Sequence, residues 1–428
     1  MQNTAPHLAV APSGRSFGWV DLLVTVGLVG LLWAALHFGQ GMLVHFDADA
    51  MPALDPSPAA IPSYAGRTLL RMWIAFGCSL VFAIAVGYLA AKNRTARALI
   101  LPALDVLQSV PVLGFLSATV TAFMALFPGS LLGVECAAIF AIFTGQVWNM
   151  AFGFYHSMVT IPSDLQEAAT TCGLGRWQRF RTVELPASAH SLIWNSMMSF
   201  GGGWFFVAQS EAISVMNKDI KLPGLGSYMA MAIERGDDHA AFWAVVAMLL
   251  LILVSDQLVW RPLLAWADRF KIELTGSAAA AAPTSWVYDL LRGAYLFTWL
   301  NERVGQPVAD RLQRIVSRAS SLCVRPGVHT QRWLLRAVGA LLGVYVAVQG
   351  VSALAAAVAA LHGALNWGAV GEIVGLGALT ALRVAAMTVF ATLVWTPVGV
   401  WIGLQPRIAR FAQPLAQIGA SFPVNMTF

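Results

Sequence analysis

One polar segment, 162–186, holds the residues of this chain whose types and spacing best suit a chemical role. Glu167 is followed directly by Ala168 and Ala169. A carboxylate in the first turn of a helix complements the helix dipole, and paired alanines leave a smooth face that another protein can approach closely. Gly173 suits the end of the helix, because glycine accepts the left-handed conformation without strain. These residue types suit contact with a partner surface rather than catalysis.

The elements that must position these residues are two short helices joined by a turn. Ser163 and Gln166 have the spacing of a capping box, so the first helix is predicted to start immediately after Pro162. Leu185-Pro186 marks the entry to the next apolar segment. The turn between the two helices leads into a basic stretch that contains Arg176, Arg179 and Arg181.

The spacing of these residues resembles the signature loop of binding-protein-dependent ABC importer permeases (type I). The pattern is glutamate-Ala-Ala, three residues, glycine, nine residues, an aliphatic residue, any residue and then Leu-Pro. Val183 stands where that family usually has isoleucine. The resemblance covers 65–262 well and 380–428 in part. In that family the loop is cytoplasmic and docks into a groove on an ATPase subunit; an ordinary amphipathic surface loop is the alternative interpretation. The ATPase contacts implied by the resemblance are Glu167, Ala168, Ala169, Gly173, Arg176, Val183, Leu185 and Pro186.

Composition places the whole chain in a membrane. Hydrophobic residues make up 58% of the sequence and charged residues 11%, with a mean hydropathy of +0.69. These values exclude an ordinary soluble protein and predict an all-α polytopic membrane protein, because apolar stretches long enough to cross a bilayer recur. The predicted spans lie near 18–38, 68–91, 98–126, 133–157, 187–210, 240–260, 335–361 and 380–404, and a ninth starts near 411.

The basic residues give these spans a direction. With a cytoplasmic N-terminus, 20 of the 26 Lys and Arg residues fall on the cytoplasmic side, as the positive-inside rule requires. The segment 162–186 then also lies in the cytoplasm, which its motif did not presuppose. We therefore expect a multi-pass protein of a bacterial inner membrane, and the net charge of +5 does not indicate nucleic acid binding.

An internal repeat joins two parts of the chain at a constant offset of 312 residues. Both copies begin at an outer membrane face, so the repeated modules are predicted to be parallel. The offset would place a second glutamate-Ala-Ala loop near position 479, and the interpretation is a fused double permease whose second module is cut short. The identical pairs include Thr68/Thr380, Arg71/Arg383, Pro102/Pro414, Ser109/Ser421 and Pro111/Pro423.

The predicted organisation has four regions. An N-terminal tail, first span and outer loop (1–64) precede the first permease module (65–262), which carries the coupling loop 163–186. A cytoplasmic connector (263–334) follows, and residues 335–428 are the start of the second permease module, which is cut short. Within the connector, 286–318 is either part of a plain fusion linker or an amphipathic helix on the membrane surface.

Ionisable residues and kinks inside predicted spans are candidates for a transport pathway. Glu211 is hypothesised to shape its outer mouth, because Gly224-Leu225-Gly226 downstream resembles the nitrate/sulfonate/taurine branch of these permeases. The repeated Ser-x-Pro-Val kink either lines the pathway or is purely structural. Glu135 and Asp21, near span ends, are interpreted as interfacial. The candidates are Asp105, Ser109, Pro111, Glu211, Ser421 and Pro423.

Several chemistries are excluded by the sequence. It has no Gly-x4-Gly-Lys-Ser/Thr phosphate loop, no metal-ligand spacing among its eight histidines and no cysteine framework. The resemblance implies a permease that is not itself an enzyme and binds no cofactor. Its partners would be two ATPase subunits, which hold ATP and magnesium, and an extracytoplasmic solute-binding protein that delivers a small, anionic solute. An ion-coupled secondary transporter and a non-transporting membrane fragment are the alternatives.

Overall fold

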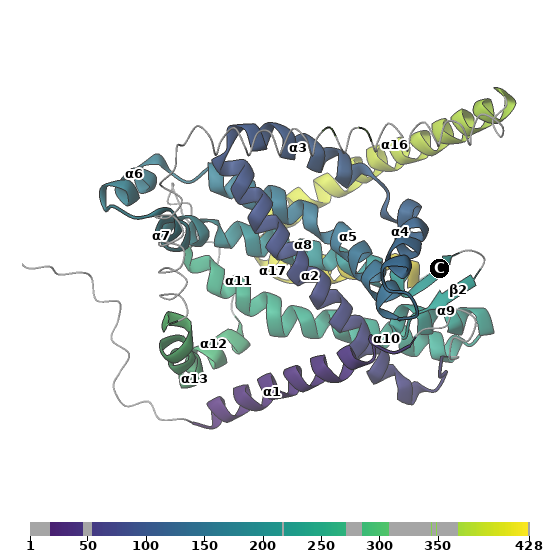
Figure 1. Cartoon of the computed structure of the whole chain (residues 1–428), viewed down its shortest axis with the longest axis horizontal. Helices are drawn as coiled ribbons and strands as arrows, with labels where there is room; N and C mark the ends of the chain where they lie inside the picture. Colours follow the sequence, from purple (N-terminus) through teal and green to yellow (C-terminus); the bar gives the residue numbers. More distant parts are fainter. Residues whose placement is uncertain are drawn as a thin grey trace, which may run out of the picture. The chain divides into compact units, whose positions relative to one another are not determined.

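Long apolar helices make up most of the computed structural model, which describes residues 18–45, 54–215, 218–270, 285–307, 344, 348 and 367–426. Figure 1 shows the helices and strands coloured along the sequence. The chain divides into two units, of which one comprises 1–307 together with 414–428 and the other comprises 308–413. Within the described residues, five helical segments are long and apolar enough to cross a membrane: 19–40, 58–92, 132–159, 238–270 and 370–403. The described residues therefore fit an all-α polytopic membrane protein.

Three helices form the centre of the first unit: α2 (Ile61–Lys92), α5 (Leu132–Val159) and α8 (Leu185–Glu211). Small residues let them approach closely, as is common between membrane helices. A Cβ added at Gly87 of α2 would lie 2.9 Å from a ring carbon of Phe154 and 3.2 Å from the carbonyl oxygen of Ala151, both in α5. Methyl-sized additions at this crossing would therefore separate α2 from α5.

An aromatic cluster packs beside these three helices. Trp73 of α2 lies 4.8 Å from Phe200 of α8, ring centre to ring centre, and 6.4 Å from Trp260. Trp260 ends a π-turn (Asp256–Trp260) that joins α10 (Asp238–Ser255) to α11 (Arg261–Ala267). This packing fixes α10 and α11 against α2 and α8.

The predicted span 98–126 is two separate helices, and the break between them lies at the predicted Ser-x-Pro-Val kink. α3 (Arg94–Ser109) and α4 (Val112–Leu126) are separated by Val110 and Pro111, which both have extended backbone. Proline lacks the N–H that a continuous helix would need and disfavours a helical residue before it. At its start, α3 is capped by the side chain of Asn93, which accepts from Thr95 N–H at 3.0 Å.

The second repeat copy has the same local structure as the first. α17 (Pro406–Ser421) begins and ends 312 residues after α3, and the short turn Val424–Met426 begins 312 residues after α4. α16 (Trp367–Gly403) in the other unit starts earlier than predicted. The predicted span 335–361 lies outside the described residues except for 344 and 348.

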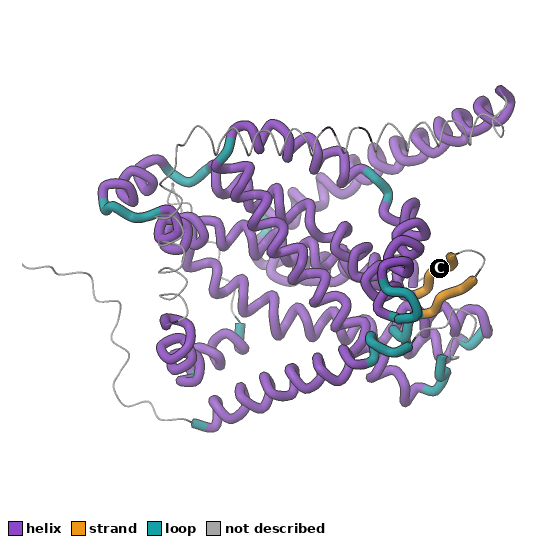
Figure 2. Tube along the Cα trace, in the orientation of Figure 1, coloured by secondary structure: helices purple, strands orange, loops and turns teal. Residues whose placement is uncertain are grey.

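A short antiparallel hairpin was not expected in an all-α protein (Figure 2). β1 (Ala212–Val215) follows α8 directly and pairs with β2 (Lys218–Lys221), with Ala212 opposite Lys221. The hairpin leads into α9 (Leu225–Arg235), which precedes α10. We call this the hairpin end of the first unit.

The N-terminal helix α1 (Trp19–Gln40) exposes most of its apolar side chains, as a lipid-facing helix would. Asp21 is buried near its start, and its carboxylate accepts from the N–H of Leu296 at 2.7 Å. The connector is therefore anchored to α1. The predicted helix 286–318 is interrupted at Ala294 and lies outside the described residues from 308 onwards. Its described parts are α12 (Trp286–Gly293), α13 (Tyr295–Leu300) and a π-turn, Asn301–Gly305.

Candidate functional site: the coupling loop and a buried charge cluster

The coupling loop begins where the sequence predicts, though without a side-chain cap. α6 (Ser163–Thr171) starts immediately after Pro162. The predicted capping box is wrong, because Ser163 hydrogen bonds to the neighbouring Asp164 side chain. The amide of Gln166 instead donates to the carbonyl of Ile161 at 3.2 Å and accepts from Arg179 at 2.9 Å.

Gly173 ends α6 in the left-handed conformation, with a φ of 68°. Two reversed hydrogen bonds close the helix: Leu174 N–H donates to the carbonyl of Ala169 at 3.1 Å, and Gly173 N–H donates to that of Thr170 at 2.9 Å. This pattern is a Schellman motif, which strongly favours glycine. Gly173 therefore sets the direction in which the chain leaves α6, and the predicted helix end at this glycine is confirmed.

The exposed face of α6 is narrower than expected. Glu167 and Ala168 are exposed, whereas Ala169 is 4% exposed and faces the body of the protein. Arg176, at the start of α7 (Arg176–Arg179), is also exposed. A π-turn (Phe180–Glu184) then leads into α8, whose second residue is Pro186. A docking partner would meet the glutamate and the first alanine.

A buried carboxylate, which the sequence analysis did not identify, holds this loop. Glu184 is 1% exposed and accepts from the ammonium of Lys92, at the end of α2, at 2.5 Å. Its Oε1 also lies 3.2 Å from Nε of Arg179. Since Arg179 also bonds Gln166 of α6, one chain of polar contacts joins α6, α7, α8 and α2. We call this end of the unit the loop end.

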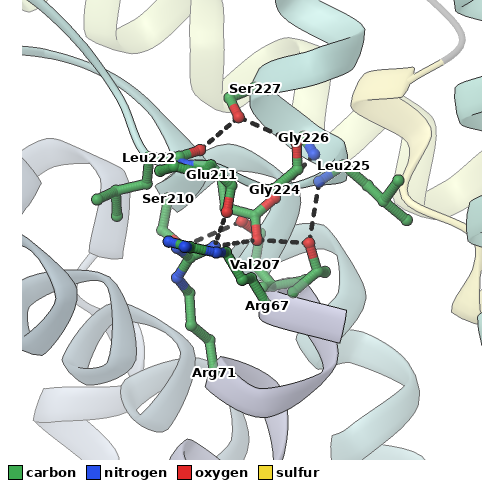
Figure 3. Close-up of polar contacts among 12 residues, drawn as sticks. Arg67, Arg71, Val207, Ser210, Glu211, Leu222, Gly224, Leu225, Gly226 and Ser227 are labelled. Carbon is green, nitrogen blue, oxygen red and sulfur yellow. Dashed lines mark hydrogen bonds and ion pairs between the residues drawn. The ribbon is translucent and has the colours of Figure 1, made fainter. Parts of the chain in front are cut away.

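A second buried charge cluster lies near the hairpin end (Figure 3). The guanidinium of Arg71 contacts both oxygens of Glu135, at 2.5 and 2.7 Å, and Oε1 of Glu211 at 2.7 Å. All three side chains are 0% exposed. Arg71 comes from α2, Glu135 from α5 and Glu211 from α8, so one arginine ties the three central helices together. A buried ion pair is expensive to break, because removing one partner leaves an uncompensated charge.

A hydroxyl group and a backbone N–H complete the hydrogen bonds of the Glu211 carboxylate. Its Oε1 accepts from the hydroxyl of Thr68 at 2.7 Å, and its Oε2 accepts from Gly226 N–H at 2.7 Å. The Thr68 hydroxyl accepts in turn from Leu225 N–H at 2.9 Å. A Cβ at Gly224 would collide with the Glu211 carboxylate. In the Gly-Leu-Gly sequence, Gly224 therefore leaves room for the Glu211 carboxylate, and Gly226 donates its N–H to it. The guanidinium of Arg67, one turn before Arg71, also lies beside the cluster (Figure 3).

Beyond the cluster, Tyr228 supports the start of α9. It is fully buried, donates its hydroxyl to the carbonyl of Pro56 at 3.0 Å, and its ring lies 5.8 Å from that of Tyr64. Burial raises the pKa of Tyr228, because the phenolate would lose its hydration. It remains a neutral donor at physiological pH.

The structure revises several sequence interpretations. Glu135 is buried, so its interpretation as an interfacial residue was wrong. Glu211 is 0% exposed and bonds to Thr68 and Gly226. The sequence held one clue to Arg71: Thr68 and Arg71 both recur 312 residues later. Among the described residues, no group of His, Cys, Asp and Glu could hold a metal ion.

The other pathway candidates are not joined to this cluster. Asp105, Ser109 and Pro111 are exposed. Their counterparts in the second copy, Ser421 and Pro423, are buried. Ser421 packs against α8, where a Cβ at Gly201 would lie 2.7 Å from its hydroxyl oxygen.

The two polar clusters lie at opposite ends of the first unit, with α6 and α7 at one end and β2 and α9 at the other (Figure 1). Residues 83–259, which include both Glu184 and Glu211, match the family of binding-protein-dependent transport system inner membrane components. This segment is therefore similar to the membrane-spanning permeases of ABC transporters. Permeases of this kind are transport components rather than enzymes, and they are multi-pass proteins of the inner membrane.

Individual relatives share this permease segment. A probable ABC transporter permease protein of Brucella abortus is 26% identical over 206 residues, which are 47% of this chain and 76% of the relative. The glycine betaine/carnitine transport permease protein of Listeria monocytogenes is 26% identical over 42% of this chain and 58% of its own length. The nitrate import permease protein of Leptolyngbya laminosa is 24% identical over 45% of this chain and 64% of its length.

Proposed function

We propose that this chain is the transmembrane subunit of an ATP-driven importer, in which two separate ATPase subunits bind ATP and magnesium and dock on the coupling loop. One observation carries the proposal. The loop presents Glu167 and Ala168 outward on a helix whose exit is fixed by Gly173. The family match covers this loop and the helices that flank it.

The loop-end contacts suggest how movement would be transmitted. Force on α6 would pass from Gln166 through Arg179 to Glu184, which lies at the start of α8 and binds Lys92 at the end of α2. The opposite ends of α2 and α8 are joined by Arg71 and Glu211. Closure of the ATPases would therefore tilt α2 and α8 together, and in this way Glu211 would shape the outer mouth through its hold on Gly226.

The membrane orientation is part of the proposal. The basic residues favour a cytoplasmic loop end, where the ATPases are, and an outward hairpin end, where a solute-binding protein would deliver its cargo. The matching bounds of α3 and α17 support a second module parallel to the first. The relatives named for nitrate and for glycine betaine leave the class of solute to be argued from the hairpin end.

Docking can be tested with two substitutions in the coupling loop. Glu167→Lys and Gly173→Pro are expected to abolish co-purification of the co-expressed ATPase subunit, while the permease still inserts into the membrane. Glu302→Lys, an exposed glutamate outside the loop, is the matched control and should leave association unchanged. Normal recovery of the ATPase with both loop variants would overturn the proposal.

A further inference from the structure

A cavity of about 270 Å³ opens at the hairpin end of the first unit. It lies between the end of α8, the hairpin, α9 and the turn Val424–Met426. Four polar side chains from four different elements line it: Gln209, Lys221, Glu234 and Asn425. Ligand pockets for drug-sized molecules usually exceed roughly 300 Å³, so this cavity suits a smaller solute.

The charged lining consists of one cation and one anion. The ammonium of Lys221, from β2, pairs with the carboxylate of Glu234, from α9. The Lys221 side chain is 26% exposed and that of Glu234 is 55% exposed. A solvent-accessible pair of this kind is weak, so a solute that binds both groups can separate them at little cost.

The amide lining provides a further acceptor. Nδ2 of Asn425 donates to Oε1 of Gln209 at 3.0 Å, which orients both amides. The other polar atom of the Asn425 amide, Oδ1, is buried and has no hydrogen-bond partner among the described residues. A buried unpaired carbonyl oxygen is costly, and an N–H donor entering the cavity would satisfy it.

These groups discriminate between solute charges. A simple anion attracted to Lys221 would be repelled by Glu234, and a simple cation would meet the reverse arrangement. A molecule with both charges satisfies both side chains, and an ammonium N–H also satisfies Asn425. The apolar remainder of the lining includes Met229 and Met426, which suit a short hydrocarbon link between the two charges.

We propose that this cavity binds a small zwitterion, with its carboxylate or sulfonate on Lys221 and its ammonium between Glu234 and the Asn425 carbonyl. The assignment rests on the importer function proposed above and narrows its solute from a simple anion to a zwitterion. The cavity also adjoins the buried cluster, because Gly226 lines it and donates to Glu211. An occupied cavity therefore abuts the contact that joins α8 to α9.

The test is equilibrium binding of radiolabelled taurine and radiolabelled nitrate to the full chain in lipid nanodiscs. Taurine should bind, and Lys221→Met and Glu234→Gln should each weaken its binding at least tenfold. Arg235→Gln removes an exposed charge next to Glu234 without touching the cavity, and it should leave taurine binding within twofold. Unchanged elution and thermal midpoints of the variants establish that they are folded.

Two results would overturn the zwitterion site. One is the absence of taurine binding to the natural sequence, or binding that neither cavity variant weakens. The other is nitrate binding that Glu234→Gln strengthens and Lys221→Met abolishes, which would mark a simple anion site. ATPase co-purification with the cavity variants separates the two proposals, because they leave the coupling loop intact. Lost association with the natural sequence would refute the importer, and lost taurine binding alone would refute only the site.

Discussion

α3 and α17 have the same local sequence pattern and the same local structure, but opposite surroundings. Each is a helix with an internal proline, and each is followed by a break at Ser-x-Pro-Val. In the first copy Ser109 and Pro111 are exposed, whereas Ser421 and Pro423 in the second are buried against the first unit. The break in the helix is thus determined locally, and burial is determined by a partner helix.

The partner of the second copy is α8, assisted by α10. Ser421 fits against α8 because Gly201 has no side chain, and Met426 is 2% exposed within the main core. Residues at the equivalent positions of α3 are not packed against another helix in the described part of the chain in this way. Val106, for example, is 65% exposed. A repeat can therefore preserve a kink while only one copy uses it for packing.

The largest difference between the copies should appear at their shared arginine. Arg71→Met leaves Glu135 and Glu211 buried without the cation that pairs with both, so we expect a loss of about 3–5 kcal/mol in the free energy of unfolding. Arg383→Met, at the equivalent position, alters an exposed side chain and should change it by less than about 0.5 kcal/mol. Thermal unfolding of both variants in detergent measures the difference. Equal midpoints would show that the buried cluster does not hold α2, α5 and α8 together.

A smaller loss of stability is expected where Ser421 packs against α8. Gly201→Val introduces methyl groups where a Cβ alone would already be 2.7 Å from the serine oxygen, and overpacking of this kind costs about 1–3 kcal/mol. A Cβ at Gly202 meets nothing within 4 Å, so Gly202→Val is the matched control. Hydrogen exchange of residues 417–426 should accelerate in the first variant only. Equal protection in both would mean that this segment does not depend on α8.

The smallest change compares the two serines directly. Ser109→Cys and Ser421→Cys keep nearly the same side-chain volume and should leave stability almost unchanged. Because Ser109 is exposed and Ser421 is 9% exposed, we expect a polar maleimide to label the first cysteine at least tenfold faster. Site-resolved mass spectrometry distinguishes these sites from the native cysteines. Similar labelling rates would contradict the difference in burial.

The sequence predicted best what depends on neighbouring residues. The start of α6 after Pro162, the left-handed Gly173 and the entry to α8 at Leu185 follow from local backbone preferences, and the structure has all three. The cluster of Arg71, Glu135 and Glu211 could not be predicted in this way, because its members are separated by 64 and 140 residues from the arginine. Their meeting depends on the packing of three helices.

Other misses have similarly physical reasons. The run from 98 to 126 was interpreted as one span with a kink at Ser-x-Pro-Val, because hydropathy does not show that Pro111 ends one helix and starts another. The hairpin 212–221 was missed because its strands are four residues each and follow α8 without a break. Glu184 was overlooked because its partners Lys92 and Arg179 lie on other elements.

α8 carries a buried carboxylate at each end, Glu184 just before its first residue and Glu211 as its last. Its 27 residues span about 40 Å. In an importer built on this helix, thermodynamic linkage applies across that length. If the ATPase at one end raises solute affinity at the other by some factor, the solute must raise ATPase affinity by the same factor. Both affinities can be measured separately, and the two fold-changes have to be equal.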